Sequence, residues 1–316
     1  MQISLAQAIA QRNAEGPAPL IRYATLAGAQ LFVGAAAIFA RFALGGAGPL
    51  AVSYLRLGIA AAVVLVLLFA RGGADRKRLA GRGELVLALA GVALAVHFAG
   101  WIASLEFTSI AVATLLVCTS PLFTGIADAI KQRRLPSRSF GLALVCGAAG
   151  LALVVDARAS TVPVEGHAVL GAFLATLGGA AMAAYLMLVR NVRRDVSTLG
   201  IIARTYSWAA ISIVPLALLA HENPPPLSAT AAWLGILAMA FVSQLLGHTS
   251  INIALRWFTP TTVGFSTLFE PVAAAVLAAI VFKEALGGST LLGAILLFAA
   301  IALAIRDQAA GAEMEL

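Results

Sequence analysis

Charged residues are scarce in this sequence: only 11% of its 316 residues are Asp, Glu, Lys or Arg, whereas 61% are hydrophobic. Soluble domains usually carry about 25% charged residues, so this composition excludes a water-soluble globular protein. Cysteine is nearly absent as well, and the two present, Cys118 and Cys146, both lie inside apolar runs. We therefore expect reduced packing residues and no disulfide framework.

The sequence also lacks the short motifs of common enzymes. It contains no His-Glu-x-x-His, no Gly-x-Ser-x-Gly and no phosphate-binding Gly-x-x-x-x-Gly-Lys loop. Its four histidines and two cysteines do not have the spacing of metal ligands. We expect no enzyme activity, no metal and no cofactor, and the missing phosphate loop argues against ATP-driven transport by this chain alone.

Long apolar runs fill most of the chain, whose mean hydropathy is +0.97. A helix needs about 20 apolar residues to cross a bilayer. Such windows lie at about 23–44, 50–70, 84–105, 109–130, 138–156, 167–189, 198–220, 231–254, 261–282 and 288–305. The sequence therefore predicts an all-α membrane protein with ten transmembrane helices and no room for a soluble domain.

Basic residues gather in alternate loops. Only Arg41, Arg158 and Lys283 fall on the other side of the predicted topology. Because cytoplasmic loops carry the excess of Lys and Arg, we expect both termini in the cytoplasm and a location in the bacterial inner membrane. The net charge of +7 then reflects topology, and nucleic acid is not an expected partner. The residues on the basic side are Arg12, Arg22, Arg71, Arg76, Lys77, Arg78, Arg82, Lys131, Arg133, Arg134, Arg138, Arg190, Arg193, Arg194, Arg256 and Arg306.

Two prolines and two arginines recur at similar spacing. Pro121 and Pro271 are 150 positions apart, and Arg56 and Arg204 are 148 apart. The members of each pair lie in spans that are five apart in the predicted order. A repeat with an odd number of crossings inverts its second copy, as in many secondary transporters. We expect a first repeat at 23–157 and a second at 158–306, between a cytoplasmic segment 1–22 and a tail 307–316.

Both prolines lie near the middle of an apolar window. A proline inside a helix removes one backbone donor and crowds the carbonyl four residues earlier, here that of Val117 or Thr267. Within a membrane, that carbonyl needs a partner from protein or cavity water. The sequence predicts matched kinks at Pro121 and Pro271 that act as hinges.

On these residues the chain resembles the EamA type of the drug/metabolite transporter superfamily, from about residue 23 to residue 305. The resemblance implies ten spans in two inverted five-span repeats, and it is greatest to bacterial exporters of amino acids such as the YddG-type aromatic amino acid exporters. The first repeat departs from the pattern at Arg134, where the family often has the glutamate that Glu284 retains. The resemblance is carried by Arg56, Arg204, the small-residue run 108–113 before Ser120-Pro121, and Glu270-Pro271 followed by Glu284.

The eighth window carries Gln244, His248 and Asn252 at a spacing of four residues. That spacing places all three on one face of an α-helix, and polar groups that face lipid without partners are costly. The stripe therefore faces either a cavity, where it would bind substrate, or a neighbouring helix, where it would hold the bundle together.

Further substrate-binding candidates lie in the first, third and sixth windows. His97 and Trp101 share a face of the third, and Gln30 and Tyr185 lie in the first and sixth. A histidine in a span is either a proton relay or a buried hydrogen-bonding group. Trp101 is either a substrate-stacking residue or a member of the aromatic belt at the membrane surface.

Three charges lie inside the windows. Arg56 and Arg204 are each about six residues from a window end, and a structural role common to both repeats is favoured over substrate binding. Glu270 directly precedes Pro271, whereas the first repeat has Ser120 there. A carboxylate at that depth serves proton coupling, binds a substrate amino group, or pairs with a span arginine or freed backbone groups.

These observations predict a secondary transporter that exports small metabolites, with amino acids, aromatic or otherwise amphipathic, as the expected substrates. It would work by alternating access through a central cavity. Its expected partners are the substrate and the lipid bilayer, and we expect a monomer. Efflux of cationic drugs or uptake of another small metabolite is the alternative, and a non-transporting membrane protein or intramembrane enzyme is more remote.

Overall fold

A computed structural model describes residues 17–71, 81–108, 110–133, 136–156, 168–193, 195–282 and 288–313. Every regular element in those ranges is helical. Of the residues named above, Arg76, Lys77, Arg78, Arg134, Arg158, Arg194, Lys283, Glu284 and the segment before residue 17 lie outside the described part. Within the described residues, six helical stretches are long and apolar enough to cross a membrane: Pro19–Ala43, Pro49–Ala70, Gly81–Phe107, Val169–Val192, Thr198–Leu219 and Thr230–Ala254.

The other four predicted spans are not among these six stretches. They correspond to α8 (Arg138–Asp156), to α15 (Gly288–Glu313) and to two spans that are each interrupted near their middle. The helical character of these windows is confirmed, and the number of membrane crossings stays a prediction. The interrupted spans consist of α6 (Ile110–Val117) followed by α7 (Ser120–Gln132), and of α13 (Pro260–Ser266), the 3₁₀ turn η3 (Thr267–Phe269) and α14 (Glu270–Phe282).

Local signals set where several helices begin. α4 (Pro49–Ala70) starts with a proline at its first position, where no N–H is needed. The Ser197 side chain accepts a hydrogen bond from Gly200 N at the start of α10 (Thr198–Leu219), and Thr259 caps α13 in the same way through Thr262 N. These caps satisfy backbone donors that helix geometry leaves free.

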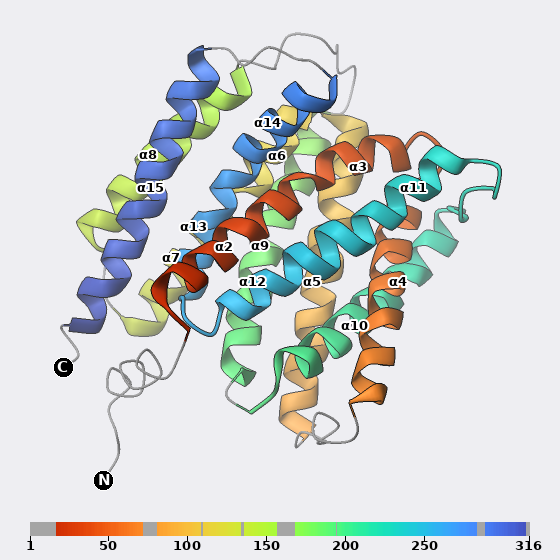
Figure 1. The fold of residues 1–316 in the computed structure, drawn as a ribbon, viewed down its shortest axis with the longest axis horizontal. Coiled ribbons are helices and arrows are strands. Elements are labelled where there is room, and N and C mark those ends of the chain that lie inside the picture. The colour runs from red at the N-terminus through yellow and green to blue at the C-terminus, as the bar shows by residue number, and fades with distance from the viewer. Residues whose placement is uncertain are drawn as a thin grey trace.

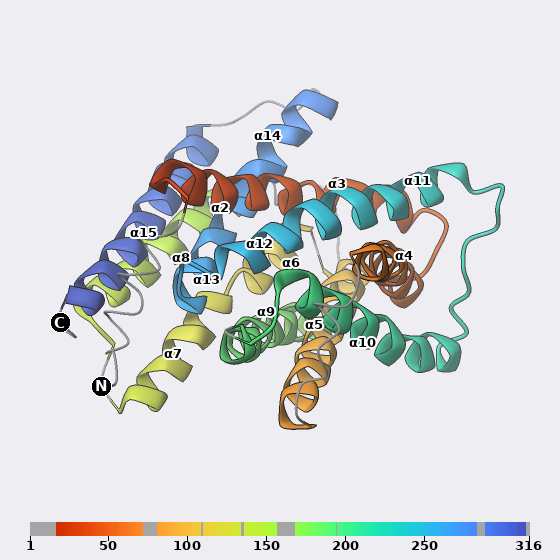
Figure 2. The ribbon, with the colours of Figure 1, turned by 60° about the horizontal axis from the view of Figure 1, so that its bottom comes forward.

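The helices pack as pairs of segments that are distant in the sequence (Figure 1). The run α2 (Pro19–Gly34) and α3 (Ala36–Ala43) lies along the run α11 (Thr230–Ala238), η2 (Met239–His248) and α12 (Thr249–Ala254). In addition α4 packs on α10, and α5 (Gly81–Phe107) packs on α9 (Ala168–Val192). The pair α8 and α15 lies at one side of the molecule in both ribbon views (Figures 1 and 2).

Glycines allow two of these pairs to approach closely. A Cβ atom at Gly100 of α5 would lie 2.8 Å from the carbonyl oxygen of Leu174 in α9. One at Gly235 of α11 would lie 2.6 Å from the carbonyl oxygen of Phe39 in α3. Both distances are too short for any larger residue, so each glycine lets its helix approach the backbone of the other closely, as is common in membranes.

Basic residues mark one end of the bundle, which we call the basic face. Four contacts join helix ends there. Arg204–Glu84 joins α10 to α5, and Arg190–Phe258 O joins α9 to the turn after α12. Thr261–Asp128 joins α13 to α7, and Ser137–Asp307 joins the start of α8 to the end of α15. The basic residues near these ends are Arg82, Lys131, Arg133, Arg138, Arg190, Arg193, Arg256 and Arg306.

Other helix ends gather at the opposite face. There the Glu222 carboxylate, just after α10, accepts a hydrogen bond from Ala51 N at the start of α4, at 2.9 Å. Because α4 begins at this face and α10 begins at the basic face, the two packed helices run in opposite directions.

The interruptions at the prolines differ from the expected mid-helix kinks. Pro121 and Pro271 each lie in the first turn of the second helical segment, and not in the interior of a continuous helix. The backbone changes direction before each proline, at Cys118–Thr119 and at η3, because a first-turn position is where proline fits without loss of a hydrogen bond.

The two interruptions contact each other and α9. The Cys118 thiol donates to Thr267 O at 3.5 Å, and Thr267 O is the carbonyl that Pro271 leaves without its helical donor. The matching carbonyl of Val117 packs on α9, where a Cβ at Gly179 would lie 2.8 Å from it. Each interruption is therefore held by a residue from another helix.

Candidate functional site

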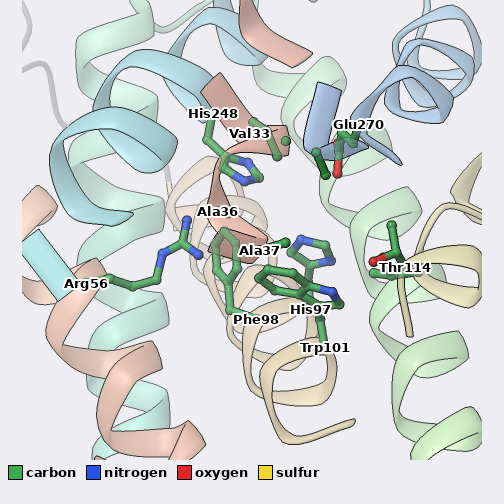
Figure 3. A pocket seen from close by; sticks show the side chains of 13 residues that line it. Val33, Ala36, Ala37, Arg56, His97, Phe98, Trp101, Thr114, His248 and Glu270 are labelled. Carbon is green, nitrogen blue, oxygen red and sulfur yellow. The ribbon is translucent and has the colours of Figure 1, made fainter. Parts of the chain in front are cut away.

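Two adjoining cavities lie between the two halves of the chain, at the level of the interruptions. Their volumes are about 30 Å³ and about 10 Å³, and His97, Val117, His248 and Glu270 border both. Figure 3 shows Arg56 and Glu270 at opposite sides of the larger one, with His97, Phe98, Trp101 and His248 between them. The larger cavity is lined by Val33, Gly34, Ala36, Ala37, Arg56, His97, Phe98, Trp101, Thr114, Val117, His248, Glu270 and Ala274.

Arg56 is the most unusual residue of the site because its whole side chain is buried, with 0% exposed. Its Nη2 donates to the Gln244 side-chain oxygen at 2.9 Å, and its guanidinium carbon lies 4.1 Å from the centre of the Phe98 ring. Its Nε and Nη1 have no hydrogen-bond partner, and no carboxylate of a described residue pairs with it. The cavity wall therefore holds a cation without a counterion, which is rare inside proteins.

Gln244 holds Arg56 from a helix with unusual winding. η2 is a π-helix of ten residues, in which the backbone bonds of an α-helix are replaced by longer i→i+5 bonds. The carbonyl of Gln244 accepts from the hydroxyls of Tyr206 at 3.4 Å and Thr249 at 3.5 Å. These bonds fix the backbone at the residue whose side chain orients the guanidinium. π-Turns are frequent at functional sites.

Two histidines face each other across the cavity. Their ring centres are 6.1 Å apart, and His248 also lies edge-on to Phe98 at 4.9 Å. His97 Nδ1 is 3.0 Å from Gly178 O, and a carbonyl only accepts, so Nδ1 carries a proton and Nε2 is left for another partner. His248 Nδ1 is buried without a partner. The pair thus offers unused hydrogen-bonding capacity to a bound molecule.

Trp101 belongs to the cavity wall. Its ring is 8% exposed, and its Nε1 has no hydrogen-bond partner. It lines the larger cavity one turn beyond His97 on α5 (Figure 3). This position agrees with the expectation that the two residues share a face, and it differs from the membrane-surface belt that was the alternative.

Glu270 begins α14 directly after η3, and its partly exposed side chain borders both cavities. The Glu270 side chain makes no hydrogen bond or ion pair with any described residue. In the first repeat, the matching Ser120 is buried, borders the smaller cavity, and has an unpartnered hydroxyl. The span arginines that could neutralise Glu270 do not reach it, so a salt bridge to Arg56 or Arg204 is not what holds this carboxylate.

The other predicted substrate-binding residues do not line the cavities. Asn252 and Tyr185 bond to each other, with Asn252 Nδ2 2.7 Å and Oδ1 2.9 Å from the Tyr185 hydroxyl, and Asn252 Nδ2 also donates to His248 O at 2.8 Å. Gln30 Nε2 donates to Ser266 Oγ at 2.8 Å. These residues tie helices together beside the cavity. For Asn252, this is the contact with a neighbouring helix that was the alternative to substrate binding.

Arg204 lies apart from the cavity. Its Nε is 3.0 Å from a Glu84 carboxylate oxygen at the basic face, with side chains 18% and 38% exposed. Among the described residues Arg204 has an acidic partner and Arg56 has none, and the structural role expected for both stays a prediction. Glu84 was not singled out from the sequence, since a glutamate near a span end is typical of any loop boundary.

The chain matches known proteins over most of its length. The EamA-like transporter family matches residues 21–156 and 169–306. The uncharacterized transporter YyaM of Bacillus subtilis (strain 168) is 25% identical over 240 residues, which are 74% of this chain and 77% of that protein. A solved crystal structure of another protein has a TM-score of 0.73 at 20% identity, over 89% of this chain and 96% of that one, and so supports the fold alone. The chain belongs to the EamA-like transporter family, and its apolar helices make it a multi-pass membrane transporter.

Proposed function

We propose that this protein is a secondary transporter that exports small metabolites, amino acids in particular, from the cytoplasm by alternating access through the central cavity. The observation that carries the proposal is the composition of the cavity wall. Arg56 and His97 come from the first half of the chain, and His248 and Glu270 from the second. Convergence of buried polar groups from both halves at one site is the arrangement of secondary transporters with a substrate site at the repeat interface.

We propose in addition that ten spans form two inverted repeats, 23–157 and 158–306. The helix pairing supports this symmetry. The first span packs on the eighth and the third on the sixth, which are equivalent pairs under exchange of the two halves. The second packs on the seventh and the fifth on the tenth, and each of these pairs exchanges with itself. The equivalent helices α4 and α10 run in opposite directions, which supports an inverted second repeat.

The proposed motion is a change in angle at the two interruptions. α7 and α14 would swing about the non-helical or 3₁₀ segments before Pro121 and Pro271, where fewer regular backbone bonds resist bending. In this conformation, the contacts Arg204–Glu84 and Thr261–Asp128 hold helix ends from different halves together at the basic face. Because the basic face is positively charged, we place it on the cytoplasmic side of the bacterial inner membrane.

Glu270 has two proposed uses, and both fit its lack of a protein partner. It either takes up a proton that drives export, or accepts the ammonium group of the substrate. Binding of a proton and of an ammonium group at one carboxylate would be mutually exclusive, which is the condition for exchange of substrate against protons.

Uptake of radiolabelled substrates into proteoliposomes tests the proposal. The purified chain, reconstituted alone, is assayed with a panel of amino acids, dipeptides, sugars and organic cations, with and without a pH gradient, against protein-free liposomes. We expect saturable flux of at least one amino acid. If sugars or other compounds move and no amino acid does, the substrate class is wrong. If nothing moves under any gradient, a non-transporting role or an intramembrane enzyme takes its place.

Efflux of cationic drugs is the second candidate. It is favoured by one observation, the carboxylate of Glu270 in a cavity that also contains the rings of Phe98 and Trp101, because aromatic rings and carboxylates attract organic cations. Flux of the organic cations in the panel decides between amino-acid export and drug efflux. We expect none, because Arg56 in the same cavity repels cations.

A further inference from the structure

Arg56 has more hydrogen-bonding capacity than the protein uses. A guanidinium carries five N–H donors, and the structure employs one of them, from Nη2 to Gln244. Nη2 has two N–H groups that point to different edges of the guanidinium plane. One complete edge, able to donate two parallel hydrogen bonds, therefore stays free whichever group Gln244 occupies.

The surroundings of Arg56 position this cation but do not neutralise it. Phe98 lies against the guanidinium plane at 4.1 Å, and Gln244 is neutral. The charged group on the other side of the cavity, Glu270, makes no ion pair with it. A fully buried cation that keeps its charge needs an anion to offset the loss of hydration. Because Arg56 is among the residues that line the larger cavity, that anion can come from a ligand.

The geometry suits a carboxylate better than other anions. Guanidinium and carboxylate form two parallel hydrogen bonds in one plane, which matches the free edge. The lining of the larger cavity also includes Ala36 and Ala37, whose side chains are small. The cavity also places a carboxylate at its far side (Figure 3), which would repel a second negative charge on the ligand and attract a positive one.

We propose that Arg56 is the substrate-carboxylate site of this transporter, that Gln244 orients it, and that the ammonium group of the same substrate faces Glu270. The transported molecule is then a zwitterion, and neither an organic cation nor a dianion. This inference rests on the proposed function, because it names the chemical group that selects the cargo. It also changes the meaning of Arg56, for which the sequence favoured a structural role.

A binding experiment on matched ligands tests the site. The purified full-length protein in detergent is screened with the twenty common amino acids by ligand-induced shift of its thermal unfolding temperature. The best ligand is then compared with its C-terminal amide, its decarboxylated amine and its deaminated acid. We expect the amide and the amine to bind about 30-fold more weakly or worse, since each loses the paired contact with Arg56. The deaminated acid should lose affinity less, because Arg56 still holds it.

Two variants complete the test. Arg56→Gln should lose the discrimination between the acid and its amide, and Glu270→Gln should lose the discrimination between the amino acid and its deaminated acid. Arg204→Gln, the matched arginine at the basic face, should lower the unfolding temperature but leave the ranking of the ligands unchanged. If Arg56→Gln fails to fold, the ligand comparison on the native protein decides by itself.

Different outcomes separate this inference from the proposed function. Equal binding of the acid, the amide and the amine would overturn the carboxylate site, as would full discrimination in Arg56→Gln or the absence of binding by any amino acid. Amino-acid flux in proteoliposomes without discrimination between acid and amide would leave the transporter standing and remove the site. Discriminating binding without flux would leave the site standing and remove the transport function.

Discussion

Arg56 and Arg204 occupy matching places in the two halves of the chain, yet their surroundings are opposite. Both lie about two turns into a helix, in α4 and α10, and these helices pack on each other. Arg204 pairs with Glu84 and is 18% exposed at its side chain, whereas Arg56 is fully buried and, among the described residues, has only the neutral Gln244 as a hydrogen-bond partner.

The difference shows that matching positions in the two halves can have unlike surroundings. Arg204 lies near the face where its helix begins, so a carboxylate from α5 can reach it with partial access to solvent. Arg56 lies where η2 and Phe98 close over it. The same residue type at matching positions therefore holds two helices together in one half and faces the cavity in the other.

The largest expected effect is on transport through Arg56. We expect Arg56→Gln to lower substrate flux about 30-fold or more, because a buried hydrogen-bonded charge pair with the substrate is lost. Arg204→Gln should lower flux by less than about fivefold, since it removes a partly exposed pair. The measurement is initial flux per reconstituted protein. Equal losses in the two variants would mean that both arginines serve the same structural purpose.

The next effect concerns the pair Glu270 and Ser120. Glu270→Gln should reduce flux about tenfold and make the remaining flux independent of a pH gradient, because the amide can neither bind a proton nor attract an ammonium group fully. Ser120→Ala should change flux by less than about twofold. Flux measured with the inside and outside pH varied separately checks both. Full gradient-dependent flux in Glu270→Gln would exclude this carboxylate from coupling.

Gln244 should have an intermediate effect that differs by substitution. Gln244→Ala leaves Arg56 Nη2 without its partner and should lower the free energy of unfolding by about 1–3 kcal/mol. Gln244→Glu places a carboxylate against Arg56, so we expect a stable protein that no longer binds substrate. Thermal unfolding and ligand binding of the two variants provide the test. Normal binding by Gln244→Glu would contradict the requirement for an unneutralised cation at Arg56.

The smallest effect should come from the ion pair at the basic face. A double-mutant cycle with Arg204→Gln and Glu84→Gln should give a coupling free energy of about 0.5–1 kcal/mol, as for other partly exposed pairs. Exchange of the two residues, Arg204→Glu with Glu84→Arg, should restore most of the stability. A coupling free energy of zero would mean that the Arg204–Glu84 pair does not contribute to holding the helix ends together at the basic face.

The apolar windows predicted the helices well, because hydrophobic length and backbone satisfaction leave few other structures in a membrane. They could not locate the interruptions, since the direction change precedes each proline at residues such as Cys118 and Thr267 that favour no particular break. The spacing of four residues predicted that Gln244, His248 and Asn252 face away from lipid, and all three are buried. It could not reveal that η2 is a π-helix, nor that these three side chains have three different neighbours.

The roles of the charged residues were the least predictable part of the site. Intramembrane charge singled out Arg56, Arg204 and Glu270, but only the packing of distant helices decides which of them has a partner. Glu84 and Arg204 are 120 positions apart, and Arg56 and Gln244 are 188 apart. No local pattern encodes contacts of that range, and a single sequence does not report them.

The pairing of α8 with α15 has a consequence for how the protein is made. Residues 157–287 separate the two helices, about 130 positions that a ribosome adding about 5–20 residues per second makes in roughly 7–26 s. During that time α8 has no access to the helix against which it packs, and its Gly150 lacks the backbone of Gly293 that fills the space beside it. α15 thus completes the first half of the molecule as well as the second, and a chain truncated before residue 288 would leave α8 without the helix on which it packs.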